Sequence, residues 1–185
     1  MIGGIENMKK KITATALSLA LIFPVAGPAA AANYAGNVVH KENPVSAAAK
    51  DSAKAAAAAY ALSAYEKEIV SLVNKERAKA GLKALAVDIK LSKVSRLKSD
   101  DMKKRNQMSH IGTYGSPFDM MKKFGIKYRS AGENIARGYR TPKEVMKGWM
   151  SSPGHRANIL NKKYTHIGAG YTPSGSYWTQ QFIQK

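Results

Sequence analysis

Three residues of the chain carry side chains suited to acid–base chemistry or to metal binding: His110, Glu133 and His155. Two imidazoles and a carboxylate are a donor set that Zn²⁺ or a similar divalent cation accepts, and three such ligands leave one position open to water. An imidazole can also act as a general base near neutral pH. Positions 110, 133 and 155 form no local ligand motif, however. Two interpretations therefore stay open: a metal site, or three side chains that hydrogen-bond one another.

A serine nucleophile is a further chemical possibility. Ser109, Ser151 and Ser152 lie close in sequence to a histidine, and an imidazole can activate a serine hydroxyl. The sequence contains no Gly-x-Ser-x-Gly nucleophile elbow, and serines before a Pro-Gly pair are typical of helix ends. The candidate catalytic residues are therefore His110, Glu133, His155 and Ser152, while a non-catalytic role is favoured.

The apolar residues recur at helical spacing in four segments that must position these side chains. Helices are predicted at residues 65–80, from 89 to about 102, at 117–124 and from 142 to about 150. Asp88 and Thr141 are suited to cap the second and fourth helices, and Glu144 completes a capping box with Thr141. Gly81 is a typical residue after the end of the first helix.

Strand signals lie mostly in the last third of the chain. They cover residues 132–136, 166–172 and 176–183, and residues 173–175 between the last two segments, Pro-Ser-Gly, predict a hairpin turn. Helices come first and an antiparallel hairpin comes last. This order favours an α+β layered domain over a βαβ nucleotide-binding fold.

Three segments follow one another in a fixed order: Asn-Gln-Met-Ser-His at 106–110, Ala-Gly-Glu-Asn-Ile-Ala at 131–136, and 149–160, which contains Ser-Ser-Pro-Gly-His-Arg. In this order they resemble the CAP family of cysteine-rich secretory, antigen 5 and pathogenesis-related proteins, in its bacterial, YkwD-like branch. The Leu-Val-Asn-x-x-Arg helix at 72–77 and the Ile-Gly-Ala-Gly-Tyr strand at 167–171 extend the match, which covers about residues 66–185. Each segment alone is a weak signal, and the ordered set carries the resemblance.

The resemblance implies a three-layer α-β-α sandwich with a central antiparallel sheet, and a cleft lined by two His and two Glu. His110, Glu133 and His155 match three of these four positions. Ser152 stands at the fourth position, and Glu144 is not the family position. The incomplete set makes Zn²⁺ or another divalent cation a possible cofactor only. The chain has no cysteine, so it lacks the disulfides of eukaryotic members and thiolate ligands are excluded.

The N-terminus has the order of a secretory signal peptide. Three lysines at 9–11 precede an apolar run from Ile12 to Val25, and four alanines follow at 29–32. The apolar run is short for a membrane span, which needs about 20 residues, although an uncleaved anchor is the alternative. We therefore predict a signal peptide at residues 1–32, an Ala-rich flexible spacer at 33–64, and the CAP domain at 65–185.

The chain is strongly basic, with 30 Lys and Arg against 12 Asp and Glu and a formal net charge of +18. Removal of residues 1–32 takes away three lysines and one glutamate and leaves +16. Seven basic residues crowd the second predicted helix: Lys90, Lys93, Arg96, Lys98, Lys103, Lys104 and Arg105. They form either a solvated surface or a surface for adhesion to polyanions.

Together these features predict a secreted, extracellular binding or interaction module of the cell wall or spore surface. The expected partners are anionic cell-envelope polymers, lipid headgroups or an envelope protein. We expect a monomer, no specific nucleic acid, and no transmembrane segment once the signal peptide is removed. The alternatives are a metal-dependent or Ser/His hydrolase acting on peptide or cell-wall material, and a lipid carrier.

Overall fold

A computed structural model describes residues 16–21, for which only the backbone is considered, and residues 60–185. The strands are β1 (Ala16–Leu21), β2 (Ala86–Val87), β3 (Ser130–Arg137), β4 (His166–Thr172) and β5 (Tyr177–Gln184). The helices are α2 (Ala64–Lys79), α3 (Ile89–Lys104), α4 (Pro117–Lys123), α5 (Pro142–Ser151) and α6 (Pro153–Ile159). The predicted helices and strands are thus confirmed.

The strands form one sheet in the order β1-β3-β5-β4-β2. Antiparallel pairing joins β1 to β3, β3 to β5 and β5 to β4, so the predicted α+β class with a central antiparallel sheet is confirmed. The short strand β2 is an addition, because it pairs in parallel with β4. Two residues are too few to show the period-two alternation by which a strand is found in a sequence.

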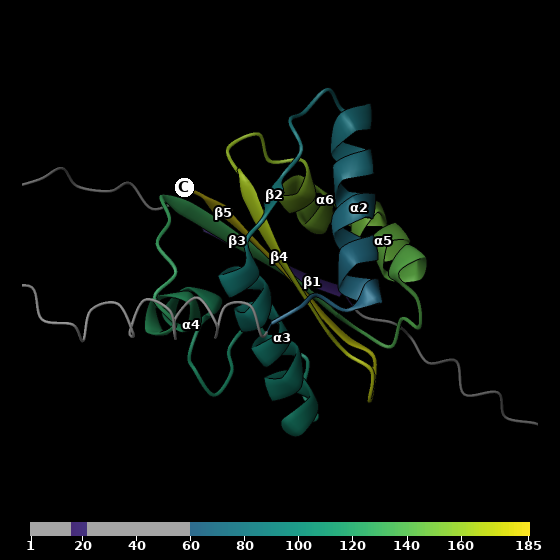
Figure 1. The fold of residues 1–185 in the computed structure, drawn as a ribbon. Helices are drawn as coiled ribbons and strands as arrows, with labels where there is room; N and C mark the ends of the chain where they lie inside the picture. The colour runs from purple at the N-terminus through teal and green to yellow at the C-terminus, as the bar shows by residue number, and fades with distance from the viewer. Residues whose placement is uncertain (1–15, 22–59) are drawn as a thin grey trace, which may run out of the picture.

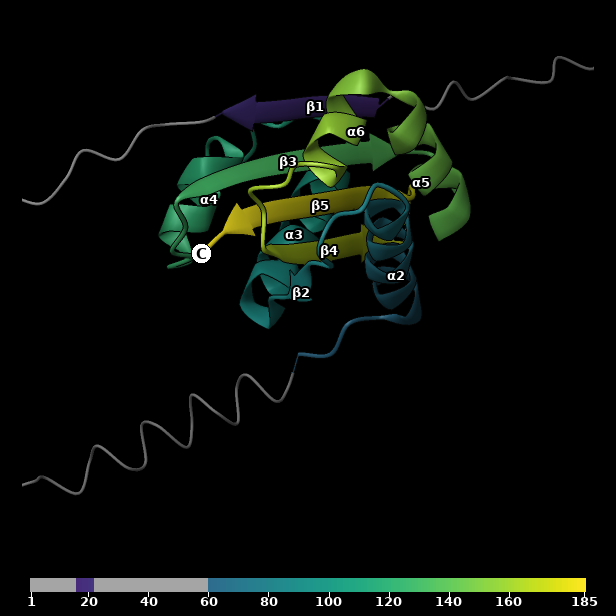
Figure 2. The same ribbon diagram turned by 90° about the horizontal axis from the view of Figure 1, so that it is seen from above.

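The helices cover both faces of the sheet (Figures 1 and 2). Helices α2, α5 and α6 lie on one face, and α3 and α4 lie on the other. The predicted three-layer arrangement is therefore present. It places β3, which carries Glu133, between α6 and α3, and these helices carry or contact the other candidate residues.

Two apolar cores fill the spaces between the layers. The core under α2, α5 and α6 contains the fully buried Trp149 and Trp178. The core under α3 and α4 contains Leu91, Met121 and Ile183. At about 25 cal/mol per Å² of apolar surface, burial of such large side chains is the main stabilising term for a domain without disulfides.

Helix α3 lies unusually close to β4. A side chain at Gly168 would collide with the backbone of Leu91, and one at Gly170 would collide with the backbone of Ser95. Two glycines at alternate positions therefore let the helix backbone approach the strand, and this contact sets the depth at which the polar side chains of α3 meet the sheet.

Helices α2, α3, α4 and α5 begin at residues whose side chains cap the helix N-terminus. The Asp88 carboxylate accepts a hydrogen bond from Leu91 N (2.8 Å), and Thr141 and Glu144 form the predicted capping box. A further capping box joins Ser63 to Glu66 at the start of α2. Each such cap contributes about 1 kcal/mol and defines where its helix starts.

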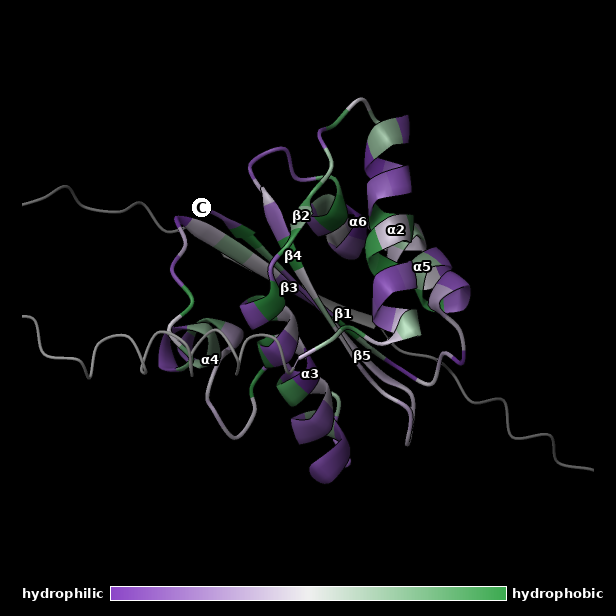
Figure 3. Cartoon of the chain, viewed as in Figure 1, coloured by the Kyte–Doolittle hydropathy of each residue, from purple (hydrophilic) through white to green (hydrophobic). Residues whose placement is uncertain are grey.

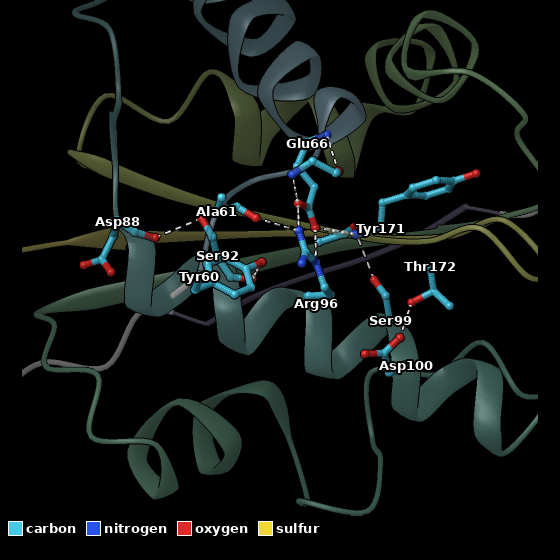
Figure 4. A network of polar contacts seen from close by, with 12 residues as sticks. Tyr60, Ala61, Glu66, Asp88, Ser92, Arg96, Ser99, Asp100, Tyr171 and Thr172 are labelled. Atoms are coloured by element: carbon cyan, nitrogen blue, oxygen red, sulfur yellow. Dashed lines mark hydrogen bonds and ion pairs between the residues drawn. The ribbon is translucent and has the colours of Figure 1, made fainter. Parts of the chain in front are cut away.

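Glu66 also connects three parts of the domain (Figure 4). It is 1 % exposed, its Oε1 accepts hydrogen bonds from Arg96 Nε (2.8 Å) and Tyr171 N (3.1 Å), and its Oε2 pairs with Arg96 Nη2. The hydrogen bond to Glu66 raises the pKa of the Arg96 guanidinium. Helix α2, helix α3 and the end of β4 are thus tied to one carboxylate.

The packed domain begins a few residues before position 65. Leu62 is buried, and the Tyr60 hydroxyl donates a hydrogen bond to Ser92 O (3.0 Å). Residues 60–64, assigned above to the spacer, therefore contact the domain, because a tyrosine and a leucine interrupt the alanines there. The remainder of the predicted spacer, and the predicted signal peptide except for β1, lie outside the described residues. Within the described part, no helix is both long and apolar enough for a bilayer.

Candidate functional site

His110 and Glu133 form a buried pair. Nδ1 of His110 lies 2.8 Å from Oε1 of Glu133, and the two residues are 7 % and 0 % exposed. Gln181 on β5 donates from Nε2 to the other carboxylate oxygen of Glu133 (2.9 Å), and Ser95 on α3 donates to Gln181 Oε1 (3.1 Å). Both oxygens of Glu133 are therefore engaged by protein donors.

This geometry selects one form of the His110 ring. An ionised carboxylate accepts hydrogen bonds and donates none, so Nδ1 of His110 carries the proton toward Glu133. The other ring nitrogen, Nε2, is buried and has no hydrogen-bond partner among the described residues. In the neutral ring Nε2 is then an acceptor, open to a donor or to a metal ion.

The loop that carries His110 is held by one face of α3. Lys98 Nζ donates to His110 O (2.6 Å), Thr113 donates from Oγ1 (2.5 Å) to Asp101, and Arg105 Nη2 donates to Ile111 O (3.0 Å). Positions 98, 101 and 105 lie three and four apart, which places them along one stripe of a helix. We call Lys98, Asp101 and Arg105 the loop clamp.

Burial affects the pKa values of Lys98 and Asp101 in the loop clamp. Desolvation lowers the pKa of the Lys98 ammonium, and the carboxylates of Glu133 and Asp101 oppose that change only in part. Burial also tends to raise the pKa of Asp101, but the hydrogen bonds from Thr113 and the charge of Arg105 outweigh it, so this pKa lies below its ordinary value. The site thus holds a buried cation beside two carboxylates.

His155 reaches the same strand from the other side of the sheet. The residue is 1 % exposed, and its backbone O accepts a hydrogen bond from Asn134 Nδ2 (3.1 Å). Asn158, one turn later in α6, donates to Glu133 O (3.3 Å) and to Asn134 Oδ1 (2.8 Å). Adjacent strand residues point to opposite faces, so Glu133 faces the α3 layer with His110, and Asn134 faces α6.

Asn134 and Asn158 both fasten α6 to β3. The three residues of the resemblance lie on or beside one strand, and His110 and Glu133 are joined by a hydrogen bond. In residues 16–21 and 60–185, no group of three His, Cys, Asp or Glu side chains is arranged to hold a metal ion. The hydrogen bond between His110 and Glu133 is the kind of contact that the hydrogen-bonded interpretation expects.

Ser151 and Ser152 lie where α5 meets α6, whereas Ser109 lies in the loop after α3 and accepts a hydrogen bond from Ile111 N (3.2 Å). Ser152 ends α5 and caps α6 without a side-chain hydrogen bond, and Ser151 Oγ donates to Lys147 O (2.8 Å). Within the described chain, no hydrogen bond joins Ser152 to His110 or Glu133. Glu144 serves its capping box and does not join the site. Glu144 and Ser152 are thus residues of helix ends.

Sequence reasoning placed Lys98 among the solvated basic residues of the second helix, and for this lysine the interpretation is wrong. Lys98 is 2 % exposed. The sequence position of Lys98 could have indicated its burial, because this lysine lies four residues after Val94 and four before Met102, on the buried stripe of α3. Gln181 was missed as well. Its place on β5 carries no local chemical signal, and only the pairing with β3 brings it to Glu133.

The fold and this site define a class, a three-layer domain in which a histidine from the loop after α3 pairs with a glutamate on the central strand β3. Residues 70–182 match the model of the cysteine-rich secretory protein family, CAP. The chain belongs to this family.

Two curated relatives come from Bacillus subtilis. The chain is 63% identical over 125 residues to the uncharacterized protein YkwD of Bacillus subtilis (strain 168), a match that covers 67% of this chain and 49% of YkwD. It is 40% identical over 121 residues to the uncharacterized membrane protein YlbC of the same organism, covering 65% of this chain and 34% of YlbC. The chain thus spans half or less of the curated relatives it matches.

Solved structures share the fold. An extracellular protein from Bacillus anthracis that contains an SCP domain superimposes with a TM-score of 0.63 at 34% identity, covering 65% of this chain and 40% of that one. An outer surface protein of Borrelia burgdorferi gives a TM-score of 0.60 at 21% identity, covering 64% and 91%. The second likeness concerns the fold alone.

Proposed function

We propose that this protein is a secreted, non-catalytic binding module that adheres to anionic polymers of the bacterial cell envelope. The signal-peptide-like N-terminus and the extracellular relative from Bacillus anthracis support export. The observation that carries the proposal is the excess of exposed positive charge on the domain.

Most lysines of the domain are exposed and few are paired. In residues 60–185 the ion pairs of Lys and Arg involve Lys79, Arg96, Arg105 and Lys185. Hydrophilic residues cover the outward faces of α2 and α3 (Figure 3). A surface with so many unpaired cations attracts polyanions over a Debye length, about 8 Å at physiological salt.

One basic hollow concentrates this charge. It has a volume of about 520 Å³ and lies where the start of α3 meets residues 125–129. Lys90, Lys127 and Arg129 line it, and Asp88, its one acidic side chain, is paired with Lys185 (2.9 Å). Three cations around a hollow suit the phosphate groups of a wall polymer, which an Arg can bind through two hydrogen bonds.

The His110–Glu133 pair takes a supporting role in this proposal. Its side chains are buried and bonded to each other, to Gln181 and through the loop clamp to α3. Catalysis by a serine would need a hydroxyl within reach of an imidazole, and the contacts of Ser152 and Ser151 give no support for that.

Metal binding is a separate and weaker proposal. One observation favours it, the buried Nε2 of His110 without a hydrogen-bond partner among the described residues. Zn²⁺ bound at this nitrogen would need further ligands, and His155 is the second imidazole that the family resemblance supplies. Calorimetric titration of the wild type, H110A and H155A with Zn²⁺ tests this, and heat lost in both variants would support a shared site.

The adhesion proposal is tested by co-sedimentation of the exported protein with purified cell walls, with and without their anionic polymers, at increasing NaCl. We expect binding that weakens steeply with salt and requires the anionic polymer. The variant K90E/K127E/R129E should lose at least about tenfold in affinity, since each lost phosphate contact removes a counterion-release contribution.

A matched control carries the same change of charge on another face. Lys67, Lys75 and Lys83 are exposed and lie on or just after α2. K67E/K75E/K83E should lose affinity less than about threefold. Equal losses in the two variants would overturn the role of the hollow. Absence of wall binding by the wild type at low salt would overturn adhesion altogether.

A further inference from the structure

The sheet ends in a strand that comes from the far N-terminus of the chain. β1 pairs antiparallel with β3 over six consecutive residues, from Ala16 opposite Ala136 to Leu21 opposite Ala131. Figure 2 shows β1 along the border of the sheet, next to β3 and close to α6. Leu19 stands opposite Glu133, so the middle of this pairing lies at the residue that holds His110.

β1 lies inside residues 1–32, the predicted signal peptide. β1 contributes no residue to the other four strands or to the two apolar cores, because strands β3-β5-β4-β2 and both cores are built from residues after 60. Once an exported chain has lost residues 1–32, β3 becomes a border strand. Its main-chain groups on that side lose the partners that β1 provides.

An unpaired edge of β3 would cost free energy, because its main-chain groups lie in a buried part of the domain. Residues 130–136 of β3 are buried when β1 is present. Buried main-chain N–H and C=O groups are almost always hydrogen-bonded, and an unpaired strand edge is a template for another extended chain. Two carbonyls of β3 already accept side-chain hydrogen bonds, Glu133 O from Asn158 and Ile135 O from Trp149. In both bonds the side chain is the donor, so neither bond provides an acceptor for a main-chain N–H group of β3.

We infer that, in the processed protein, the border of β3 binds an extended apolar segment of another protein by strand addition, in the register of residues 16–21. The segment whose backbone forms β1 reads Ala-Leu-Ser-Leu-Ala-Leu, a sequence without charge in which small and aliphatic residues alternate, and we take this sequence as the guide to the partner. Main-chain hydrogen bonds supply affinity in this mode, and alternate side chains supply selectivity.

The bound segment would run between the two histidine positions. Glu133 directs the His110 pair toward the α3 layer, while Asn134 and Asn158 fasten α6, with the buried His155, on the opposite face. A peptide on β3 would therefore lie between the layer of α3, which receives the His110–Glu133 pair, and helix α6, which carries His155. This inference rests on removal of residues 1–32 and not on the basic hollow, so it and the adhesion proposal can fail separately.

The test uses the exported protein, with its processed N-terminus verified by mass spectrometry. The probe is a fluorescent ALSLAL peptide flanked by lysines, whose charge opposes nonspecific attraction to this basic protein. Fluorescence anisotropy should show saturable binding. Amide exchange measured by NMR should slow at residues 131–136 of β3 when the peptide is added.

Two isomeric control peptides distinguish strand addition from hydrophobic adsorption. One carries N-methyl groups on its first, third and fifth residues, and the other on its second, fourth and sixth. In an antiparallel edge pair only alternate residues point their N–H groups at the neighbouring strand. One isomer should therefore bind at least about tenfold more weakly than the other.

Three results would overturn the inference. They are equal affinity of the two isomers, absence of saturable binding, and protection confined to residues outside β3. A processed protein that stays dimeric at saturating peptide would assign the border strand to a second copy of the chain and would overturn it too. The unprocessed chain, whose own β1 occupies the place, should bind the peptide at least about tenfold more weakly.

Discussion

The ammonium of Lys98, on the buried stripe of α3, donates a hydrogen bond to the backbone oxygen of His110 at 2.6 Å. This contact links the helix that packs on β4 to the loop that presents the imidazole. The position of His110 opposite Glu133 therefore depends on a residue that has no catalytic or ligand-binding chemistry of its own.

Replacement of Lys98 by Met should destabilise the domain by about 1–3 kcal/mol, because it leaves the carbonyl of His110 buried without its donor. Urea unfolding measures the change. Lys93→Met is the matched control, since Lys93 is exposed on the same helix, and its effect should stay within about 0.5 kcal/mol. Similar effects of the two substitutions would show that the hydrogen bond to His110 contributes nothing to stability.

Asp101 should make stability depend on pH in the acid range. Its folded pKa lies below the ordinary value, so the folded state binds the proton less readily than the unfolded state does. Its contribution is fully present above the ordinary carboxyl pKa, near 3.9, and is lost as the pH falls through the lowered folded value.

D101N, which cannot ionise, tests this pH dependence. It should be less stable than the wild type by about 1 kcal/mol at pH 7, and the difference should shrink below about pH 4. Urea unfolding at pH 7, 5, 4 and 3 gives both curves. A constant difference across that range would contradict the role assigned to the carboxylate.

The Glu133 carboxylate should keep neutral His110 protonated on Nδ1. Long-range ¹H–¹⁵N NMR correlations of the imidazole report this tautomer directly. E133Q replaces the acceptor-only carboxylate by an amide that can also donate, so the tautomer preference should weaken and stability should fall by about 2 kcal/mol.

Gln180 provides a control for that substitution. It is equally buried on β5, and its side chain faces Asn134 instead of Glu133. Q180E should leave the His110 tautomer unchanged, whatever it does to stability. An Nε2-protonated ring in the wild type would refute the assignment of the pair.

Breaking the Glu66–Arg96 pair should be the most damaging polar substitution in the domain. E66Q removes the buried charged acceptor of Arg96, whose own side chain is 30 % exposed, and the cost should be about 3 kcal/mol in chemical denaturation. Glu76→Gln removes the exposed pair with Lys79 and should change stability by less than about 0.5 kcal/mol. Equal losses of stability in E66Q and E76Q would show that burial of the Glu66–Arg96 pair does not increase its contribution to stability.

The local elements of this fold could be predicted from the amino-acid order. Asp88, Thr141 and Gly81 define helix ends through interactions with residues a few positions away. The alternation in residues 166–172 and 176–183 defines the final hairpin in the same way. Such signals depend on near neighbours only, and for that reason they survive without knowledge of the tertiary structure.

The candidate site depends on contacts that no local pattern records. Residue types and a family resemblance singled out His110 and Glu133, but their 2.8 Å hydrogen bond exists only because α3 holds the loop and β5 brings Gln181 alongside. The burial of Lys98 and the pairing of β1 with β3 likewise arise from segments far apart in the chain. Packing of the layers decides such contacts, because the free energy of burying each group depends on what the rest of the chain places around it.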